Sequence, residues 1–332
     1  MTNGTGAGAS LAALGEFALI ERVVAAIGDP EPDGPGAVLV GPGDDAALLR
    51  VPTGSVLATT DVMVEGRHFR REWSTASDVG HKVAAANLAD IAAMGGTATA
   101  LLVAFAAPPE TPAQWAIELS EAVAAEAGLV GARVIGGDTS SASALTIAVT
   151  ALGELPAGSA PVLRSGARPG DVVALAGRLG WAAAGLAALG RGFRSPRLAV
   201  AAHQRPEPPY AAGPQAAAGG ASSMIDVSDG LLADLGHVAR ASGVAIDVLT
   251  ERLPVADPVA TVAAAMNADP LRFVLTGGDD HALVATFPGE RELPDGWIAI
   301  GRVVDGEGTT PVTVDGRVPS PGTRGWDHFG RG

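Results

Sequence analysis

Most residues of this chain that could do chemistry are aspartates, and most of them lie beside glycines directly after short apolar runs. Such runs are typical of β-strands. Clustered carboxylates repel one another unless cations neutralise them, and Mg²⁺ prefers oxygen ligands of this kind. The sequence therefore predicts a magnesium site, formed where aspartates at the ends of several strands point toward one shared edge of the fold. The acids concerned are Asp44, Asp45, Asp61, Asp138, Asp226, Asp229, Asp279 and Asp280, with Asp90 on the polar side of an expected helix.

Each acidic loop also has a plainer interpretation, which stays open at this point. Aspartate beside glycine is ordinary turn chemistry, and Asp229 could simply cap the helix expected after it. The spacing that forms calcium-binding loops is absent from the sequence. Magnesium is therefore preferred over calcium if the loops bind a metal.

Phosphate chemistry, if present, must work without the usual lysine. Lys82 is the only lysine, and the Gly-Lys-Ser/Thr tripeptide of a P-loop does not occur. Two other residues could contact an anion: His68, which follows Arg67, and Arg164, on a glycine-rich turn. A lone loop histidine such as His68 is more often an ordinary surface residue, and a surface position explains Arg164 equally well.

The elements that must position these residues alternate between helices and strands. In the first half, the periodicity predicts helices over residues 11–27, 77–94 and 111–128, and strands over residues 37–40, 56–60, 132–135 and 144–152. In the second half it predicts helices over residues 180–190, 196–203 and 230–242, and strands over residues 172–176, 223–227, 244–249, 271–275, 281–287 and 297–304. Residues 91–109 carry no charge, and we expect a helix end followed by a buried strand rather than a membrane span. The mixture predicts an α/β or α+β fold with two domains.

Composition excludes several classes of protein. The chain has 332 residues, of which 47% are hydrophobic and 17% charged, so it can bury a sizeable core. The net charge of −14 argues against nucleic acid and anionic membranes as partners. There is no cysteine, which excludes a disulfide framework and a thiolate nucleophile. The first residues carry no basic and apolar export pattern, and we therefore expect a cytoplasmic enzyme.

Taken together, the motifs resemble those of thiamine-monophosphate kinase, in the superfamily of aminoimidazole ribonucleotide synthetase. The resemblance runs through nearly the whole chain in the family's order. Its segments are GEFALI (15–20), GDDAALL (43–49), TTDVMVEGRHF (59–69), NLADIAAMG (87–95), IGGDT (135–139), RSGARPGD (164–171), IDVSDGLLADLGH (225–237), LTGGDDHAL (275–283) and GWDHF (325–329).

The resemblance implies transfer of the γ-phosphoryl group of ATP to thiamine monophosphate, with several Mg²⁺ ions and no P-loop. The implied metal-binding residues are Asp44, Asp45, Thr59, Thr60, Asp61, Asp90, Asp138, Asp226 and Asp229, of which Asp61, Asp138 and Asp229 are the catalytic ones. The residues implied to contact ATP are Gly137, Asp138, Arg164 and Ser228. Those implied to contact the thiamine phosphate are His68, Asp279 and either Thr323 or Trp326.

The resemblance also implies an architecture. Residues 1–154 would form an N-terminal ATP- and magnesium-binding domain whose mixed sheet serves for homodimerisation. Residues 155–332 would form an α/β sandwich that completes the active site. The composition of residues 155–160, with Pro, Gly and Ser, independently predicts that they connect the two domains.

Two segments depart from the family pattern. The family usually reads GGEDYEL where this chain reads GGDDHAL, so Asp279 is one methylene shorter than glutamate, His281 replaces tyrosine and Ala282 replaces glutamate. Near the C-terminus, Thr323 stands where an aromatic residue is common, and Trp326 is the alternative partner for the substrate.

Other functions must be distinguished from the phosphorylation of thiamine monophosphate. Selenophosphate synthesis and hydrogenase maturation normally need a reactive cysteine, and the chain has none. An ATP-using enzyme of the purine-biosynthesis type and a non-catalytic nucleotide- or metal-binding module both stay open. An assay of ADP release with thiamine monophosphate distinguishes them.

Overall fold

The computed structural model describes residues 10, 14, 16–27, 38–40, 48–52, 54–289, 291–306 and 311–319. Asp44, Asp45, Thr323 and Trp326 lie outside these residues. The chain divides into two compact units. The first unit comprises Met1–Ile91 and Thr97–Gly158, and the second comprises Ala92–Gly96 and Ser159–Gly332.

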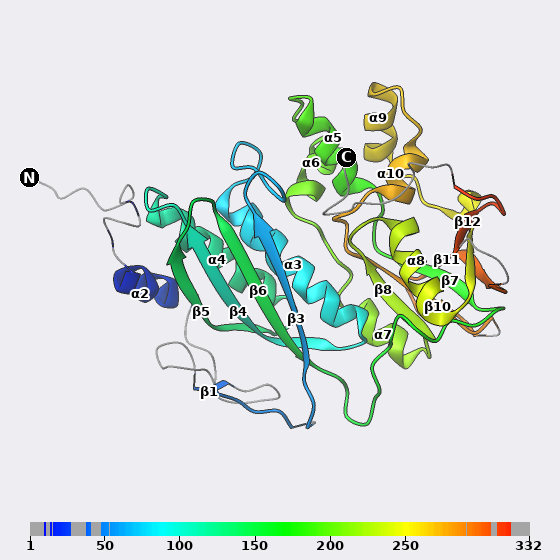
Figure 1. The fold of residues 1–332 in the computed structure, drawn as a ribbon, viewed down its shortest axis with the longest axis horizontal. Helices are drawn as coiled ribbons and strands as arrows, with labels where there is room; N and C mark the ends of the chain where they lie inside the picture. Colours follow the sequence, from blue (N-terminus) through cyan, green and yellow to red (C-terminus); the bar gives the residue numbers. More distant parts are fainter. Residues whose placement is uncertain are drawn as a thin grey trace, which may run out of the picture. The chain divides into compact units, whose positions relative to one another are not determined.

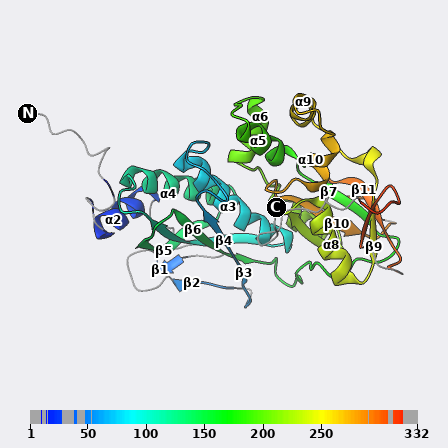
Figure 2. The same cartoon turned by 45° about the horizontal axis from the view of Figure 1, so that its top comes forward.

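The first unit is built on a four-stranded sheet with the strand order β3-β6-β4-β5. Its strands are β3 (Leu57–Val64), β4 (Thr97–Ala107), β5 (Arg133–Ser141) and β6 (Thr146–Glu154); β4 and β5 are parallel and the other neighbours antiparallel. Figures 1 and 2 show α3 (Ala76–Ala93) and α4 (Ala113–Gly128) on the same face of this sheet. The unit also holds α2 (Glu16–Ile27) and the pair β1 (Val38–Val40) and β2 (Leu48–Leu49).

Alternation along the strands gives this sheet a buried and an exposed face. On β6, Ile147 and Val149 are fully buried, whereas the residues between and beside them are half-exposed. On β3, Val62 is 49% exposed. The helix face is packed so tightly that even Lys82, on α3, is only 3% exposed. The period of two thus separates the apolar core under the helices from a more exposed sheet face, on which Ala100 and Ile135 form a small buried cluster.

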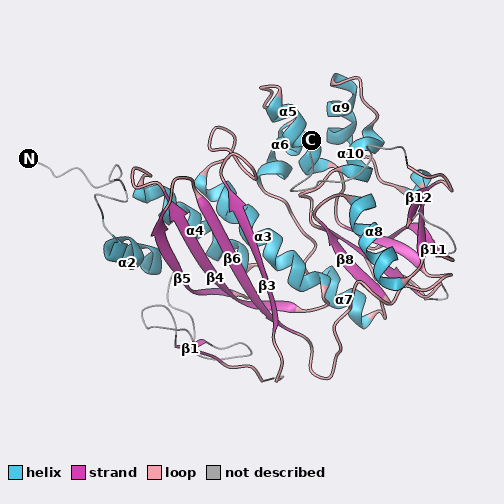
Figure 3. Ribbon diagram, viewed as in Figure 1, coloured by secondary structure: helices cyan, strands magenta, loops and turns pink. Residues whose placement is uncertain are grey.

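The second unit contains a six-stranded sheet with the order β12-β9-β11-β7-β10-β8, antiparallel except for the parallel pair β12 and β9. Its strands are β7 (Val172–Ala176), β8 (Ser223–Val227), β9 (Ala245–Val248), β10 (Ala282–Phe287), β11 (Ile298–Val304) and β12 (Val312–Val314). Its helices, cyan in Figure 3, are α5 (Trp181–Gly190), α6 (Arg197–Gln204), α7 (Ala212–Ala218), α8 (Leu231–Ser242), α9 (Asp257–Ala265) and α10 (Pro270–Thr276), with a 3₁₀ turn η1 (Thr250–Arg252).

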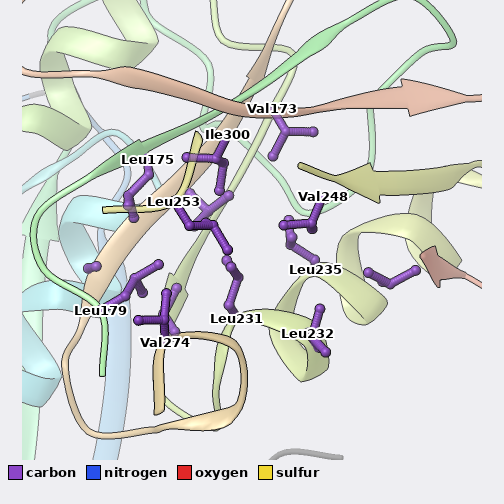
Figure 4. Packing of buried hydrophobic residues seen from close by; sticks show 14 of the residues in the cluster. Val173, Leu175, Leu179, Leu231, Leu232, Leu235, Val248, Leu253, Val274 and Ile300 are labelled. Atoms are coloured by element: carbon purple, nitrogen blue, oxygen red, sulfur yellow. The ribbon is translucent and has the colours of Figure 1, made fainter. Parts of the chain in front are cut away.

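Both faces of this sheet are covered, and each carries its own core. Val173 and Leu175 pack with residues of α5, α6, α8, α9 and α10, in the cluster drawn in Figure 4. Ala174 and Ala176 belong to a second cluster, with residues of α7 and Trp297. Strands covered on both faces should be buried throughout, and every residue of β10 is indeed buried.

Most of the expected elements are confirmed within a few residues, including residues 91–109 as the end of α3 followed by β4. The strand expected over residues 271–275 is wrong, because this segment is helix α10. Asp269 caps the helix by accepting a hydrogen bond from the Leu271 amide at 2.9 Å, and Pro270 occupies its first position. Aspartate followed by proline is a helix-start signal that outweighs the β-like composition.

Among the residues that the structure describes, no helix combines the length and the apolar character needed to span a bilayer.

Candidate active site

In the second unit, two loops that carry predicted site residues are held face to face. The turn after β8 contains Ser228, and the segment before β10 contains Asp279, whose amide donates to the Ser228 carbonyl at 2.9 Å. A Cβ at Gly278 would lie 2.2 Å from the Ser228 carbonyl oxygen, and one at Gly230 would lie 2.7 Å from that of Thr276. Only glycine permits this approach, which explains why both loops are glycine-bounded.

The buried side chain of Asp234 holds the turn after β8 in place. Its Oδ2 accepts hydrogen bonds from the amides of Asp229 and Gly230, at 3.1 and 3.0 Å. Burial, followed by the charges of Asp226 and Asp229, raises the pKa of Asp234 to about 7. The carboxylates at this turn therefore repel one another, as expected of a site that a cation would stabilise.

Asp226 is buried on β8, and His281 is its partner. The Nδ1 atom of His281 lies 3.0 Å from Oδ2 of Asp226, and both side chains are almost fully buried. His281 has a positive φ of 50°, a conformation in which histidine is more frequent than most residues. The residue that departs from the family pattern thus supplies the hydrogen bond that a buried carboxylate needs.

Asp280 connects the same segment to helix α5. Its carboxylate oxygens accept from the amides of Gly180 and Ala182, two of the N–H groups that a helix start leaves without partners. Burial raises the pKa of Asp280 to about 7; Asp279 acts in the same direction, while the two hydrogen bonds and His281 oppose it.

This pKa predicts a dependence of stability on pH. The unfolded chain releases the Asp280 proton near pH 4, whereas the folded state holds it up to about pH 7. The free energy of unfolding should therefore fall as the pH rises through this window. In urea unfolding, we expect the advantage of the wild type over Asp280→Asn to shrink by about 2 kcal/mol between pH 5.5 and pH 7. A difference that stays constant would contradict the prediction, and Asp295→Asn, at an exposed position in the same unit, is the control.

Arg164 lies exposed on its loop in the second unit, beside His237 of α8. His237 is within electrostatic range of both Arg164 and Asp229. The residue predicted to meet ATP and a residue predicted to bind metal therefore lie close to the same side chain.

In the first unit, two hydrogen bonds link predicted site residues on β3 to α3. The Thr59 hydroxyl donates to Oδ2 of Asp90 at 2.7 Å, and the Asp61 amide donates to Oδ1 of Asn87 at 3.1 Å. Asp90, expected on the polar side of its helix, is half-buried and faces β3. Thr60 points to the other face of the sheet, where its hydroxyl accepts from Thr150 at 3.1 Å.

The expectation that the aspartates lie at strand ends is wrong for Asp61 and Asp138. Asp61 is within β3 and Asp138 within β5, because the GGDTS segment continues the strand instead of forming a loop. Asp61 pairs with the buried Val149, whereas Asp138 pairs with the exposed Ala104. The register therefore places the two carboxylates on opposite edge strands and on opposite faces of one sheet.

Gly137 explains how the glycine-rich segment stays in the sheet. A Cβ at this position would lie 1.9 Å from the Val103 carbonyl oxygen on the neighbouring strand. A bulge at Leu101 and Leu102 precedes the contact. The glycines that suggest a loop in the sequence thus serve a close approach of two strands.

His68 occupies the turn that follows β3. Its Nδ1 accepts a hydrogen bond from the Val64 amide at 2.9 Å, which requires the neutral tautomer with the proton on Nε2. The ring therefore carries its proton on Nε2, and an N–H group is the kind of donor that contact with a phosphate oxygen requires.

Two residues of the site were not predicted from the sequence, namely Asn87 and Asp234. Both lie inside motifs that were recognised, NLADIAAMG and IDVSDGLLADLGH, but their partners are set by the tertiary structure. Within the described ranges, no three His, Asp or Glu side chains form a ready metal-binding group. Asp44 and Asp45 are outside those ranges, and the predicted metal set remains a prediction.

Comparisons with known proteins agree with this architecture. Residues 43–155 match the model of the AIR synthase related protein N-terminal domain, and residues 168–313 match that of the C-terminal domain. The fold class expected from the sequence, two domains of mixed α/β structure, is thereby confirmed.

Relatives of known name extend over nearly the whole chain. The thiamine-monophosphate kinase of Mycobacterium tuberculosis is 48% identical over 97% of this chain and 93% of its own length. The crystal structure of thiamine-monophosphate kinase from Stenotrophomonas maltophilia has a TM-score of 0.78 at 32% identity, covering 91% of this chain and 97% of that one. The structure of AaThiL complexed with AMPPCP and TMP has a TM-score of 0.77 at 32% identity, covering 95% and 97%.

Proposed function

We propose that this chain, which belongs to the thiamine-monophosphate kinase family of AIR synthase related proteins, transfers the γ-phosphoryl group of ATP to thiamine monophosphate and so forms thiamine diphosphate. The observation that carries the proposal is the 48% identity to a kinase of that name over 97% of the chain. The complex of the related AaThiL with AMPPCP and TMP supports the same pair of substrates. We further propose that the enzyme works in the cytoplasm.

The acceptor in this reaction is a phosphate monoester, which is largely ionised at neutral pH because its second pKa is about 6. A strong general base is therefore unnecessary, and the protein must mainly bring two polyanions together and orient them. We assign the positioning of the thiamine phosphate to the Nε2–H donor of His68 and to Asp279, with Thr323 or Trp326. Arg164, Ser228, Gly137 and Asp138 are assigned to ATP.

The donor set fits magnesium, since it consists of carboxylate and hydroxyl oxygens. At one predicted metal-binding turn, burial and then the charges of Asp226 and Asp229 raise the pKa of Asp234. Bound Mg²⁺ would neutralise the charge of the reacting phosphates. The residues that would hold it are Asp44, Asp45, Thr59, Thr60, Asp61, Asp90, Asp138, Asp226 and Asp229.

The test is direct measurement of product. Purified protein, ATP, Mg²⁺ and thiamine monophosphate should yield thiamine diphosphate and ADP in equal amounts. ATP binding without turnover would instead indicate a non-catalytic nucleotide-binding module. ADP release that depends on an aminoimidazole precursor, and not on thiamine monophosphate, would indicate the purine-biosynthesis type.

We also propose that the protein is a homodimer that pairs through the exposed face of the first unit's sheet. Val62 is 49% exposed on this face, and Ala58 and Ala104 are exposed on the same face. Apolar side chains on an uncovered sheet face are typical of an interface. Residues 1–154 would then supply dimerisation and most metal-binding residues, and residues 155–332 would complete the site.

Replacing Val62 by glutamate should convert the dimer to a monomer, because two copies of the charge would be buried without partners. Light scattering after size-exclusion chromatography measures the mass directly. Leu129→Glu is the control, since Leu129 is 70% exposed at the end of α4, away from this face. A monomeric wild type, or a Val62→Glu variant that remains dimeric, would overturn the proposed interface.

A further inference from the structure

Three basic side chains of the second unit lie together on the loop at Arg164 and on helix α8. Nη2 of Arg240 lies 3.3 Å from Nδ1 of His237. Burial, then Arg240, then Arg164 lower the pKa of His237, while Asp229 acts weakly in the opposite direction. The neutral His237 can therefore accept a hydrogen bond from the Arg240 guanidinium and orient it. We call Arg164, His237 and Arg240 the basic cluster.

The basic cluster is unusual for this protein because its positive charges are not compensated. The chain as a whole has a net charge of −14. Nevertheless, within the described part of the molecule neither Arg164 nor Arg240 forms an ion pair with a carboxylate. Two arginines that face a shared histidine without an acidic partner form a suitable place for an external anion.

The cluster is also held in place by the backbone. Oγ of Ser242, at the end of α8, accepts hydrogen bonds from the amides of Gly166 and Ala167 at 3.1 and 3.2 Å. The same hydroxyl donates to the Arg164 carbonyl at 3.2 Å. One side chain thus fixes the Arg164 loop to the helix that carries Arg240, which lowers the cost of ordering both arginines around a ligand.

The position of the cluster indicates the kind of anion. Helix α8 starts at the turn of Ser228 and Asp229, and Asp229 is close enough to influence His237. Arginines around a histidine that is also influenced by Asp229, a residue predicted to bind metal, match a ligand that carries both negative oxygens and cations. A phosphate group has this character, and the planar guanidinium can contact two of its oxygens at once.

We propose that Arg240, oriented by His237, forms with Arg164 a two-arginine phosphate clamp at helix α8. This inference rests on the proposed function in that the phosphate comes from ATP or from thiamine monophosphate. It adds Arg240 as a binding residue and His237 and Ser242 as positioning residues, none of which the sequence motifs assigned.

The experiment measures binding to the full-length protein by titration calorimetry, with ATP plus Mg²⁺ in one arm and thiamine monophosphate in the other. Arg240→Gln and Arg164→Gln should each weaken binding of one ligand roughly 10-fold, the scale of one charge-assisted hydrogen-bonding partner. The control is Arg252→Gln, which removes the same charge from an exposed position of the same unit and should change affinity less than about 2-fold.

The double variant Arg164→Gln/Arg240→Gln tests whether the two arginines bind the same phosphate group. If they do, its loss of affinity should differ from the product of the single losses. Weaker ATP binding alone assigns the clamp to the nucleotide, and weaker thiamine monophosphate binding alone assigns it to the acceptor. The clamp is overturned if Arg240→Gln behaves like Arg252→Gln in both arms. Formation of thiamine diphosphate by the wild type tests the proposed function separately.

Discussion

Replacing Asp61 or Asp138 by asparagine is expected to lower kcat by at least about 100-fold, the scale of losing one preorganised electrostatic contact. The substitution keeps the shape of the side chain and removes its charge. At Asp61 the bond to Asn87 is made by the backbone amide, so it should survive the change. Initial rates of thiamine diphosphate formation at saturating ATP, Mg²⁺ and thiamine monophosphate give kcat directly.

The matched control is Glu110→Gln, which removes a charge from an exposed position of the same unit and should leave kcat unchanged. Melting temperatures near that of the wild type would show that the inactive variants are folded. Because Asp61 and Asp138 lie on opposite faces of the sheet, each variant tests its own position. Turnover near the wild-type level in both would place the catalytic metals elsewhere.

Magnesium should convert ATP from a weak ligand into a strongly stabilising one. At the turn of Asp226, Asp229 and Asp234, burial and then the charges of the two neighbouring carboxylates raise the pKa of Asp234 to about 7. A free polyanion should be repelled there unless cations enter first or with it. At ATP about 100 times its Kd, binding to the folded state adds roughly 2.7 kcal/mol, which corresponds to several degrees in melting temperature.

Thermal melts with ATP plus EDTA, with Mg²⁺ alone and with ATP plus Mg²⁺ separate the contributions. We expect a large shift only with ATP and Mg²⁺ together. If ATP with EDTA stabilises as much, arginines and backbone amides hold the phosphates without metal. The metal-binding roles of Asp45, Asp61, Asp90, Asp138 and Asp226 would then have to be abandoned. If the two units melt in separate transitions, each transition is compared by itself.

Elements with a clear local signal could be predicted from the sequence. The helix expected over residues 230–242 is α8, Leu231–Ser242, because apolar residues recur at helical spacing directly after Gly230. The apolar run at residues 172–176 is β7 without any shift, since a strand buried on both faces needs apolar residues throughout.

The failures arose where two local signals compete. In residues 271–275, β-like composition competes with the helix start at Asp269 and Pro270, and the cap decides. In the GGDTS segment, glycine suggests a loop, yet Gly137 is needed for the approach of β5 to Val103. A sequence does not say whether a glycine serves a turn or a close contact.

The types of the site residues could be predicted, but their partners could not. The motifs identified Asp226 and singled out His281 as a departure, but only the fold brings these residues, 55 positions apart in the sequence, into hydrogen-bonding distance. The caps that Asp234 and Asp280 provide likewise depend on backbone amides that no motif encodes.

The burial of its only lysine gives the chain one buried side-chain amine that can serve as a chemical reporter. Lys82 is the only lysine and is 3% exposed on α3, so amine-directed reagents find no accessible lysine side chain on the folded protein. Its acylation therefore requires the first unit to open locally, and the labelling rate measures the free energy of that opening. The labelled Lys82 peptide, followed in mass spectrometry separately from any labelled α-amino group, would then report how ligands or substitutions alter local opening of the first unit, without any engineered tag.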